Sequence, residues 1–118
     1  MTDSILRDKC FKFSVRIVKL GQFLQSDKKD FVMSKQILRS GTAIGALTFE
    51  AAYGQSKTDF IHKLTIALKE AHETEYWLAL LHETDYIDLK LHDSFRADLR
   101  ELLAMLIASI KTARSNNE

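Results

Sequence analysis

The 118-residue sequence has no proline, only four glycines and a single cysteine. Average usage would place about six prolines in a chain of this length, and their absence favours long, uninterrupted helices. Cys10 has no partner for an internal disulfide, and we interpret it as a small buried apolar residue. No apolar run approaches the ~18 residues of a membrane span, and the charged N-terminal segment does not resemble a signal peptide. We therefore expect a cytoplasmic protein.

Apolar residues recur at spacings of three and four along most of the chain, which is the pattern of amphipathic helices. Polar runs, glycine and capping residues divide this pattern into segments. We predict helices over about 4–25, 30–53, 56–83 and 93–114, with a loop over 84–91. Because short connections force neighbouring helices to be antiparallel, the sequence predicts an all-α fold, an up-down-up-down four-helix bundle that forms one domain over 1–118.

Glycines and capping residues give expectations for helix packing and helix ends. Gly41 and Gly45 lie inside the second predicted helix, where each costs up to about 1 kcal/mol relative to alanine. We interpret them as points where a neighbouring helix approaches closely, and a groove for a ligand or partner is the alternative. Gly54 is expected to end that helix in the left-handed conformation, and Ser56 is expected to cap the next one. The fourth helix is expected to begin at Asp93 or at the residue after it.

Positive charge is concentrated in the first part of the chain, although the net charge is only +1. Residues 1–69 hold 12 Lys or Arg against 6 Asp or Glu, whereas residues 70–118 hold 5 against 10. Four cations of the first predicted helix fall within an arc of about 80° and form a basic stripe. The stripe consists of Lys9, Lys12, Arg16 and Lys19, and the residues that could extend it are Lys28, Lys29, Lys35 and Arg39. Two interpretations remain open, a solvated face that keeps the protein soluble and a surface that binds nucleic-acid phosphates.

The same helix carries apolar residues outside its core stripe. Phe11, Val15 and Val18 lie roughly opposite the basic stripe, where a monomeric bundle would expose them. We interpret them as a subunit interface, and extra core width is the alternative.

The sequence holds few signs of catalysis or metal binding. The four histidines recur every ten residues from His62 to His92, and this spacing turns each one about 80° from the last along a helix, which does not build a metal site. Glu70, Glu73 and Glu75 are interpreted as an acidic face that is solvated or pairs with the basic helix of a neighbouring subunit. No Gly-rich phosphate loop and no nucleophile elbow occurs. We therefore predict a protein that is not an enzyme and needs no metal and no cofactor.

Three blocks of the sequence are more specific than its composition. They are SKQILRSGTAIGA at 34–46, QSKTDFIHKLTIALKEA at 55–71 and EYWL at 75–78. Through these blocks the chain, from its first helix to Ile87, closely resembles the bacterial four-helix bundle family, also called 23S ribosomal RNA intervening sequence proteins. One departure is visible, because Leu47 and Thr48 stand where the family often has Asn-Ile after Gly-Ala.

The resemblance implies a left-handed antiparallel bundle that assembles into a homopentameric ring. The family is also similar to the accessory variability protein of diversity-generating retroelements, a basic pentameric barrel that partners a reverse transcriptase and nucleic acid. From the clustered charge and this likeness we predict a ring-forming accessory protein that binds the RNA or DNA backbone through its basic stripes. The alternative is a protein-interaction scaffold without nucleic-acid binding, in which the basic stripe and the acidic face pair between subunits.

Overall fold

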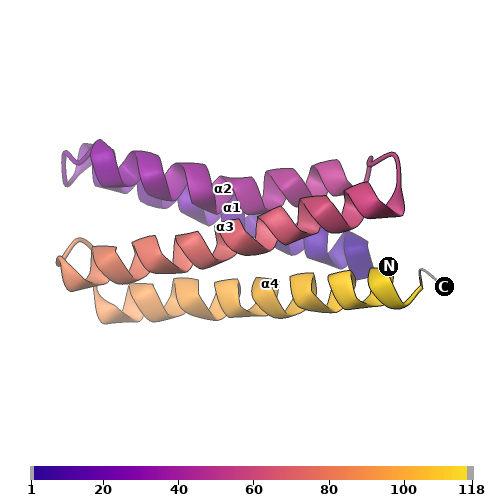
Figure 1. Cartoon of the computed structure of the whole chain (residues 1–118). Coiled ribbons are helices and arrows are strands. Elements are labelled where there is room, and N and C mark those ends of the chain that lie inside the picture. Colours follow the sequence, from indigo (N-terminus) through magenta and orange to yellow (C-terminus); the bar gives the residue numbers. More distant parts are fainter. Residues whose placement is uncertain (1, 117–118) are drawn as a thin grey trace.

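The computed structural model describes residues 2–116, which form four helices and no strand. The helices are α1 (Thr2–Ser26), α2 (Val32–Ala51), α3 (Lys57–Glu83) and α4 (Leu89–Ser115). Consecutive helices run antiparallel in an elongated bundle of 51 × 22 × 20 Å, and the start of α1 and the end of α4 lie at the same end of it (Figure 1). None of the described helices is long and apolar enough to cross a membrane. The predicted all-α four-helix bundle is confirmed.

The buried face of α1 is the one that its periodicity predicts. Spacings of three and four predict a core stripe of Leu6, Cys10, Phe13, Ile17, Leu20 and Leu24, and all six are at most 4% exposed. The same pattern predicts that Val32 and Ala52 lie on the core stripe of α2, and this is wrong, because Val32 is 75% exposed at the first residue of the helix and Ala52 is exposed beyond its last residue. On α3 the polar Thr74 is fully buried within the apolar stripe.

Small side chains on α2 bring this helix close to both of its neighbours. The buried α2 residues include Ser34, Ser40, Gly41, Thr48 and Ala51. A Cβ atom at Gly41 would lie 2.8 Å from two side-chain atoms of Ile17, so α1 approaches more closely than an alanine allows. On the other side, the Thr74 hydroxyl of α3 donates a hydrogen bond to the Ser40 hydroxyl at 3.0 Å. The interpretation of Gly41 as a point of close helix approach is therefore confirmed.

Two predicted helix ends differ from the structure. The fourth helix begins at Leu89 and not at Asp93 or Ser94, because the Asp88 carboxylate accepts a hydrogen bond from the backbone amide of Leu91 at 2.8 Å and caps the helix there. Gly54 does not take the left-handed conformation; among the described residues only Lys29 and Asp85 have positive φ, 56° and 66°. A Cβ atom at Gly54 would lie 2.7 Å from the Asp59 carboxylate, the movable end of a side chain, and 3.2 Å from the backbone oxygen of Ala51.

Cys10 and Ser56 take the roles that the sequence predicts. Cys10 is 1% exposed, its thiol donates to the Thr48 hydroxyl at 3.8 Å, and burial raises the pKa of the Cys10 thiol to about 11. A thiol with this pKa holds almost no thiolate at neutral pH, which makes it unreactive. The Ser56 side chain caps α3 by accepting from the backbone amide of Asp59 at 3.0 Å.

Gly41→Ala is expected to lower the free energy of unfolding by about 1–2 kcal/mol, because the overlap with fully buried Ile17 costs more than the gain in helix propensity. Gly45→Ala is the matched control, since its Cβ would meet the Ser14 hydroxyl at 3.0 Å, a single atom that can rotate away. Urea unfolding followed by circular dichroism measures both changes. Equal stability of the two variants would show that Ile17 does not fix the distance between α1 and α2.

Candidate functional site

The basic stripe of α1 lies along the seam with α4, where part of its charge is neutralised. Arg16 donates to the Asp98 carboxylate at 2.7 Å and to the Ser94 hydroxyl at 3.0 Å. Lys9 donates to Glu101 at 3.2 Å. These ion pairs join two helices of one chain. Pairing of the basic stripe with the third helix of a neighbouring subunit, the alternative that the sequence left open, stays a prediction.

The other two members of the basic stripe, Lys12 and Lys19, are exposed. Among the side chains that the structure describes, neither has a carboxylate within ion-pair distance. In the following loop Lys28 and Lys29 are exposed as well, and the Lys28 ammonium lies 5.8 Å from the centroid of the Phe23 ring. Unpaired positive charge therefore extends from the middle of α1 into the loop that follows it.

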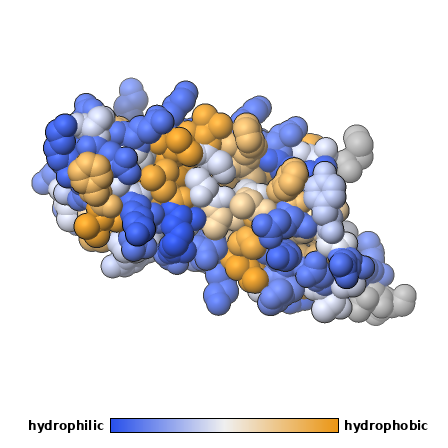
Figure 2. Space-filling view, turned by 90° about the horizontal axis from the view of Figure 1, so that it is seen from above, coloured by the Kyte–Doolittle hydropathy of each residue, from blue (hydrophilic) through white to orange (hydrophobic). Residues whose placement is uncertain are grey.

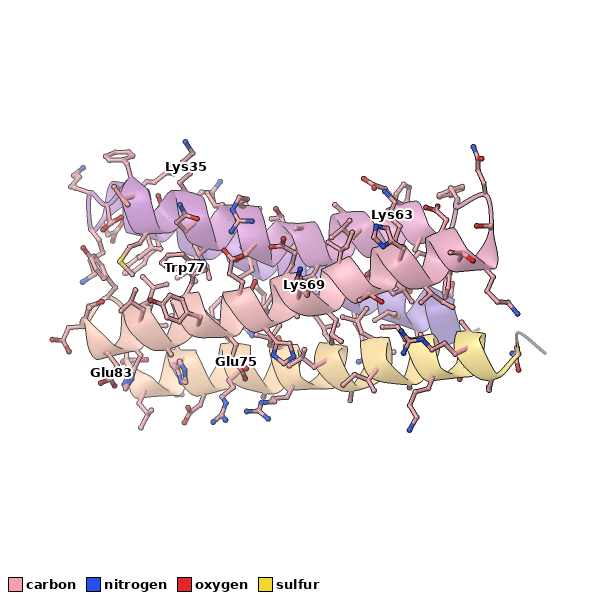
Figure 3. All side chains as sticks on the ribbon, viewed as in Figure 1. Lys35, Lys63, Lys69, Glu75, Trp77 and Glu83 are labelled. Carbon is pink, nitrogen blue, oxygen red and sulfur yellow. The ribbon has the colours of Figure 1, made fainter. Side chains whose placement is uncertain are left out.

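The two predicted cations of α2 have different surroundings. Arg39 forms ion pairs with Glu70, at 3.2 Å, and with Glu73, and Glu73 also accepts a hydrogen bond from the Trp77 indole at 3.0 Å. Lys35 is exposed and points away from the bundle (Figure 3). Arg39 is thus part of a network within the chain, and Lys35 remains available to a ligand.

The acidic face of α3 is also neutralised from within the chain. Glu75 lies 3.1 Å from the guanidinium of Arg100 on α4 and within 4.0 Å of Arg96. Together with the contacts of Arg39, this pairs all three of the acidic residues that the sequence singled out. Among the described side chains, each of these three glutamates therefore has a cationic partner within the chain.

Phe11, Val15 and Val18 lie outside the core, with exposed fractions of 71%, 39% and 39%. The sequence did not single out two further aromatic residues, Phe49 of α2 and Tyr53 just beyond its end, which are 59% and 74% exposed with ring centroids 5.2 Å apart. We call these five residues the apolar face. The spacing of Phe49 and Tyr53 could have indicated this part of the face, because residues four apart lie on the same side of a helix.

The two parts of the apolar face lie near each other because of the register between α1 and α2. A Cβ atom at Gly45 would lie within 3.5 Å of Cys10, and Cys10 directly precedes Phe11 on α1. Phe49 is one turn beyond Gly45 on α2. Seen from the α1 and α2 side, hydrophobic residues gather in the middle of the molecule among charged ones (Figure 2).

Lys12 and Lys19 adjoin the apolar face, which corrects the expectation that the two features lie opposite each other. Val15 is three residues after Lys12 and four before Lys19 on the same helix. Residues at these separations are neighbours on a helix surface. The unpaired cations of α1 therefore border the exposed valine.

Between the second half of α1 and the start of α4 lies a groove of about 270 Å³ with an apolar floor and a cationic rim. It is lined by Arg16, Lys19, Leu20, Phe23, Leu91 and Phe95. A wider opening of about 740 Å³ continues the groove toward the loop between α3 and α4, and Phe23 and Leu91 line both parts. The sequence did not predict this groove, because it depends on how α4 lies against α1.

A carboxylate and a phenol hold the two loops together at that end of the bundle. Tyr86 donates to Asp30 at 2.8 Å, and Asp30 also accepts from the backbone amides of Val32 and Met33 at 3.0 and 2.7 Å, so it caps α2. The hydrogen bond from Tyr86, followed by those from the amides, lowers the pKa of Asp30 below its ordinary value. The same contact raises the pKa of Tyr86.

The histidines do not gather around a metal site. Within residues 2–116 no group of three His, Cys, Asp or Glu residues is arranged to hold a metal ion. His82 of α3 and His92 of α4 have ring centroids 5.3 Å apart, and Nδ1 of each lies near the carboxylate of the next residue, at 3.4 Å for Glu83 and 3.1 Å for Asp93. The described surface therefore offers charged and apolar helix faces and one groove as its main features.

These features define a small four-helix bundle whose distinctive surfaces are helix faces. Residues 2–108 match the family model of the 23S rRNA-intervening sequence protein, and the chain belongs to this family. A similar solved structure is a 1.70 Å crystal structure of a protein with unknown function from the S23 ribosomal protein family, from Bacteroides thetaiotaomicron VPI-5482. It is 55% identical, with a TM-score of 0.92 over 94% of this chain and 99% of that one. No curated protein matches the chain.

Tyr86→Phe is expected to move the pKa of Asp30 up toward its ordinary value of 3.8, because its largest stabilising partner is lost. A folded pKa below the unfolded one contributes stability that is present above the unfolded pKa and lost as pH falls through the folded pKa. The variant should therefore be less stable than the wild type at neutral pH, with the difference shrinking in acid. Carboxyl NMR titration and unfolding at several pH values measure both effects.

Tyr53→Phe is the control, since Tyr53 is 74% exposed and far from Asp30 in the fold. An unchanged pKa of Asp30 in Tyr86→Phe would contradict the assignment of the shift to the phenol.

Proposed function

We propose that this chain is a non-enzymatic accessory protein that forms a homo-oligomeric ring through its apolar face and binds the backbone of RNA or DNA through its unpaired lysines. The five-fold stoichiometry of the ring is the one that the family resemblance implies. Support for assembly comes from Phe11, Phe49 and Tyr53, each more than half exposed on one side of the bundle. Large aromatic residues that gather on a surface are typical of subunit interfaces.

The observation that carries the nucleic-acid part is that Lys12 and Lys19 have no carboxylate partner among the described side chains and border the apolar face. Assembly through that face would place these lysines of neighbouring protomers along the edges of the interface. A few lysines on one protomer bind phosphate weakly, but their repetition around a ring multiplies the effect. The family description, 23S rRNA-intervening sequence protein, supports a connection with RNA.

A protein-interaction scaffold is the second candidate function. It is favoured by the ion pairs of Lys9, Arg16 and Arg39, which neutralise three of the eight predicted cations within the chain. In this case the ring would present its surface to protein partners, and the remaining lysines would only keep it soluble.

Phe49→Glu is expected to dissociate the oligomer, because it places a carboxylate beside Tyr53 in the apolar face, where burial of a charge is costly. Val32→Glu is the matched control, since Val32 is 75% exposed at the first residue of α2. Light scattering coupled to size exclusion measures the mass of each variant. A wild-type protein that is monomeric at every concentration tested would contradict the assembly proposal.

Lys12→Glu combined with Lys19→Glu is expected to weaken binding of a structured RNA by at least about tenfold at low salt and to reduce the salt dependence by about two counterions per bound protomer. Lys69→Glu with Lys111→Glu makes the same change in net charge from exposed positions on α3 and α4 and is expected to change binding by less than about threefold. Fluorescence anisotropy over a salt series measures both. Equal losses in the two double variants would assign the effect to net charge alone, and an absence of binding by the wild type would favour the scaffold.

A further inference from the structure

The groove between α1 and α4 combines two kinds of surface that nucleic acids use. Its floor is apolar, with Leu20, Phe23 and Leu91, and its rim carries Lys19. Lys28 stands at the same end and lines the wider opening. Proteins that bind single strands pair a cationic track for the phosphates with aromatic rings on which bases stack.

Phe23 is the ring in this groove that a base can contact. It is partly exposed, packs against the core and lines both parts of the groove, and the Lys28 ammonium lies 5.8 Å from its centroid. The ring of Phe95, in contrast, is 3% exposed, and the Arg16 guanidinium lies 4.1 Å from its centroid. Because Lys28 is an exposed residue with a flexible stem, a base can replace it over Phe23, and its ammonium is then free to meet a phosphate.

We propose that the α1–α4 groove binds a single-stranded segment of nucleic acid, with one unstacked base on Phe23 and the flanking phosphates on Lys19 and Lys28. This inference rests on the proposed function and names its substrate as single-stranded. A duplex keeps its bases stacked inside the helix and cannot offer a base face to the groove, although its phosphates can still meet the lysines.

The far wall of the groove sets the path of the strand. Asp85, Asp88 and Lys90 line the wider opening on the side of the α3–α4 loop and α4, and their net negative charge repels phosphate. Tyr86, on the same wall, is held by its hydrogen bond to Asp30. The backbone of the strand therefore runs on the α1 side, beside Lys19 and Lys28, and the base points across the groove.

The test compares a 12-nucleotide single-stranded RNA with a duplex of the same sequence, each labelled at one end, by fluorescence anisotropy at low salt. The wild type is expected to bind the single strand more tightly than the duplex. Phe23→Leu, which keeps apolar bulk beside the core, is expected to weaken single-strand binding by roughly 5- to 100-fold, the worth of one stacked base, and to leave duplex binding unchanged. Phe23→Trp is expected to retain or strengthen single-strand binding.

Phe31→Leu is the matched control, because Phe31 is 63% exposed in the loop after α1 and does not line the groove. Thermal unfolding verifies that all three variants fold. If the wild type binds neither RNA, the proposed nucleic-acid function fails. If it binds both RNAs equally and Phe23→Leu binds as the wild type does, the proposed function survives and the single-strand inference is overturned.

Discussion

The close approach of α2 to both α1 and α3 sets the spacing of the whole bundle. Gly41 leaves no room for a methyl group against Ile17, and on the other side Ser40 and Thr74 meet through a buried hydrogen bond. Both residues are fully buried, and the Thr74 hydroxyl also lies 2.8 Å from the backbone oxygen of Glu70, so loss of the contact would cost the Ser40 hydroxyl more. This pair therefore fixes the position of α3 along α2, in the way that a single polar contact inside an apolar core can specify register. A chain with larger residues at these α2 positions would need a wider bundle.

The openness of the α1–α4 seam follows from that arrangement. With α1 and α3 drawn onto α2, and α4 packed chiefly on α3, the pairing of α1 with α4 is the loosest of the four. The side chains that meet there include the buried rings of Phe13 and Phe95, with centroids 6.1 Å apart, and charged pairs such as Arg16 and Asp98. Arg16 also lines the groove beside Phe23, whereas Lys19, the other cation of its lining, has no carboxylate partner among the described side chains. The same packing thus accounts for the neutralised and the unpaired members of the basic stripe.

The sequence predicts the elements better than it predicts their contacts. The stripe of α1 is periodic over its whole length and every position of it is buried, because a helix packed on one side has one buried face. The start of α4 was placed too late, since the first turn exposes Leu89 by 57% and so lacks a periodic signal, although Asp88 caps it. Which cations of α1 are neutralised depends on the register of α4 against α1. The residues around Lys9 and Arg16 in the sequence do not determine this register.

In the proposed function, assembly and nucleic-acid binding are coupled by the position of Val15 between Lys12 and Lys19. A ligand that binds only the assembled ring stabilises the ring by mass action, and the ring in turn raises the local concentration of lysines around the ligand. Under this linkage salt affects both ligand binding and ring assembly. Screening weakens the contacts between lysines and phosphates, and the ring then loses the stabilisation that the bound ligand supplies. The apolar contacts of Phe11, Phe49 and Tyr53 are not screened. The proposed ring would therefore persist at high salt while it releases its ligand.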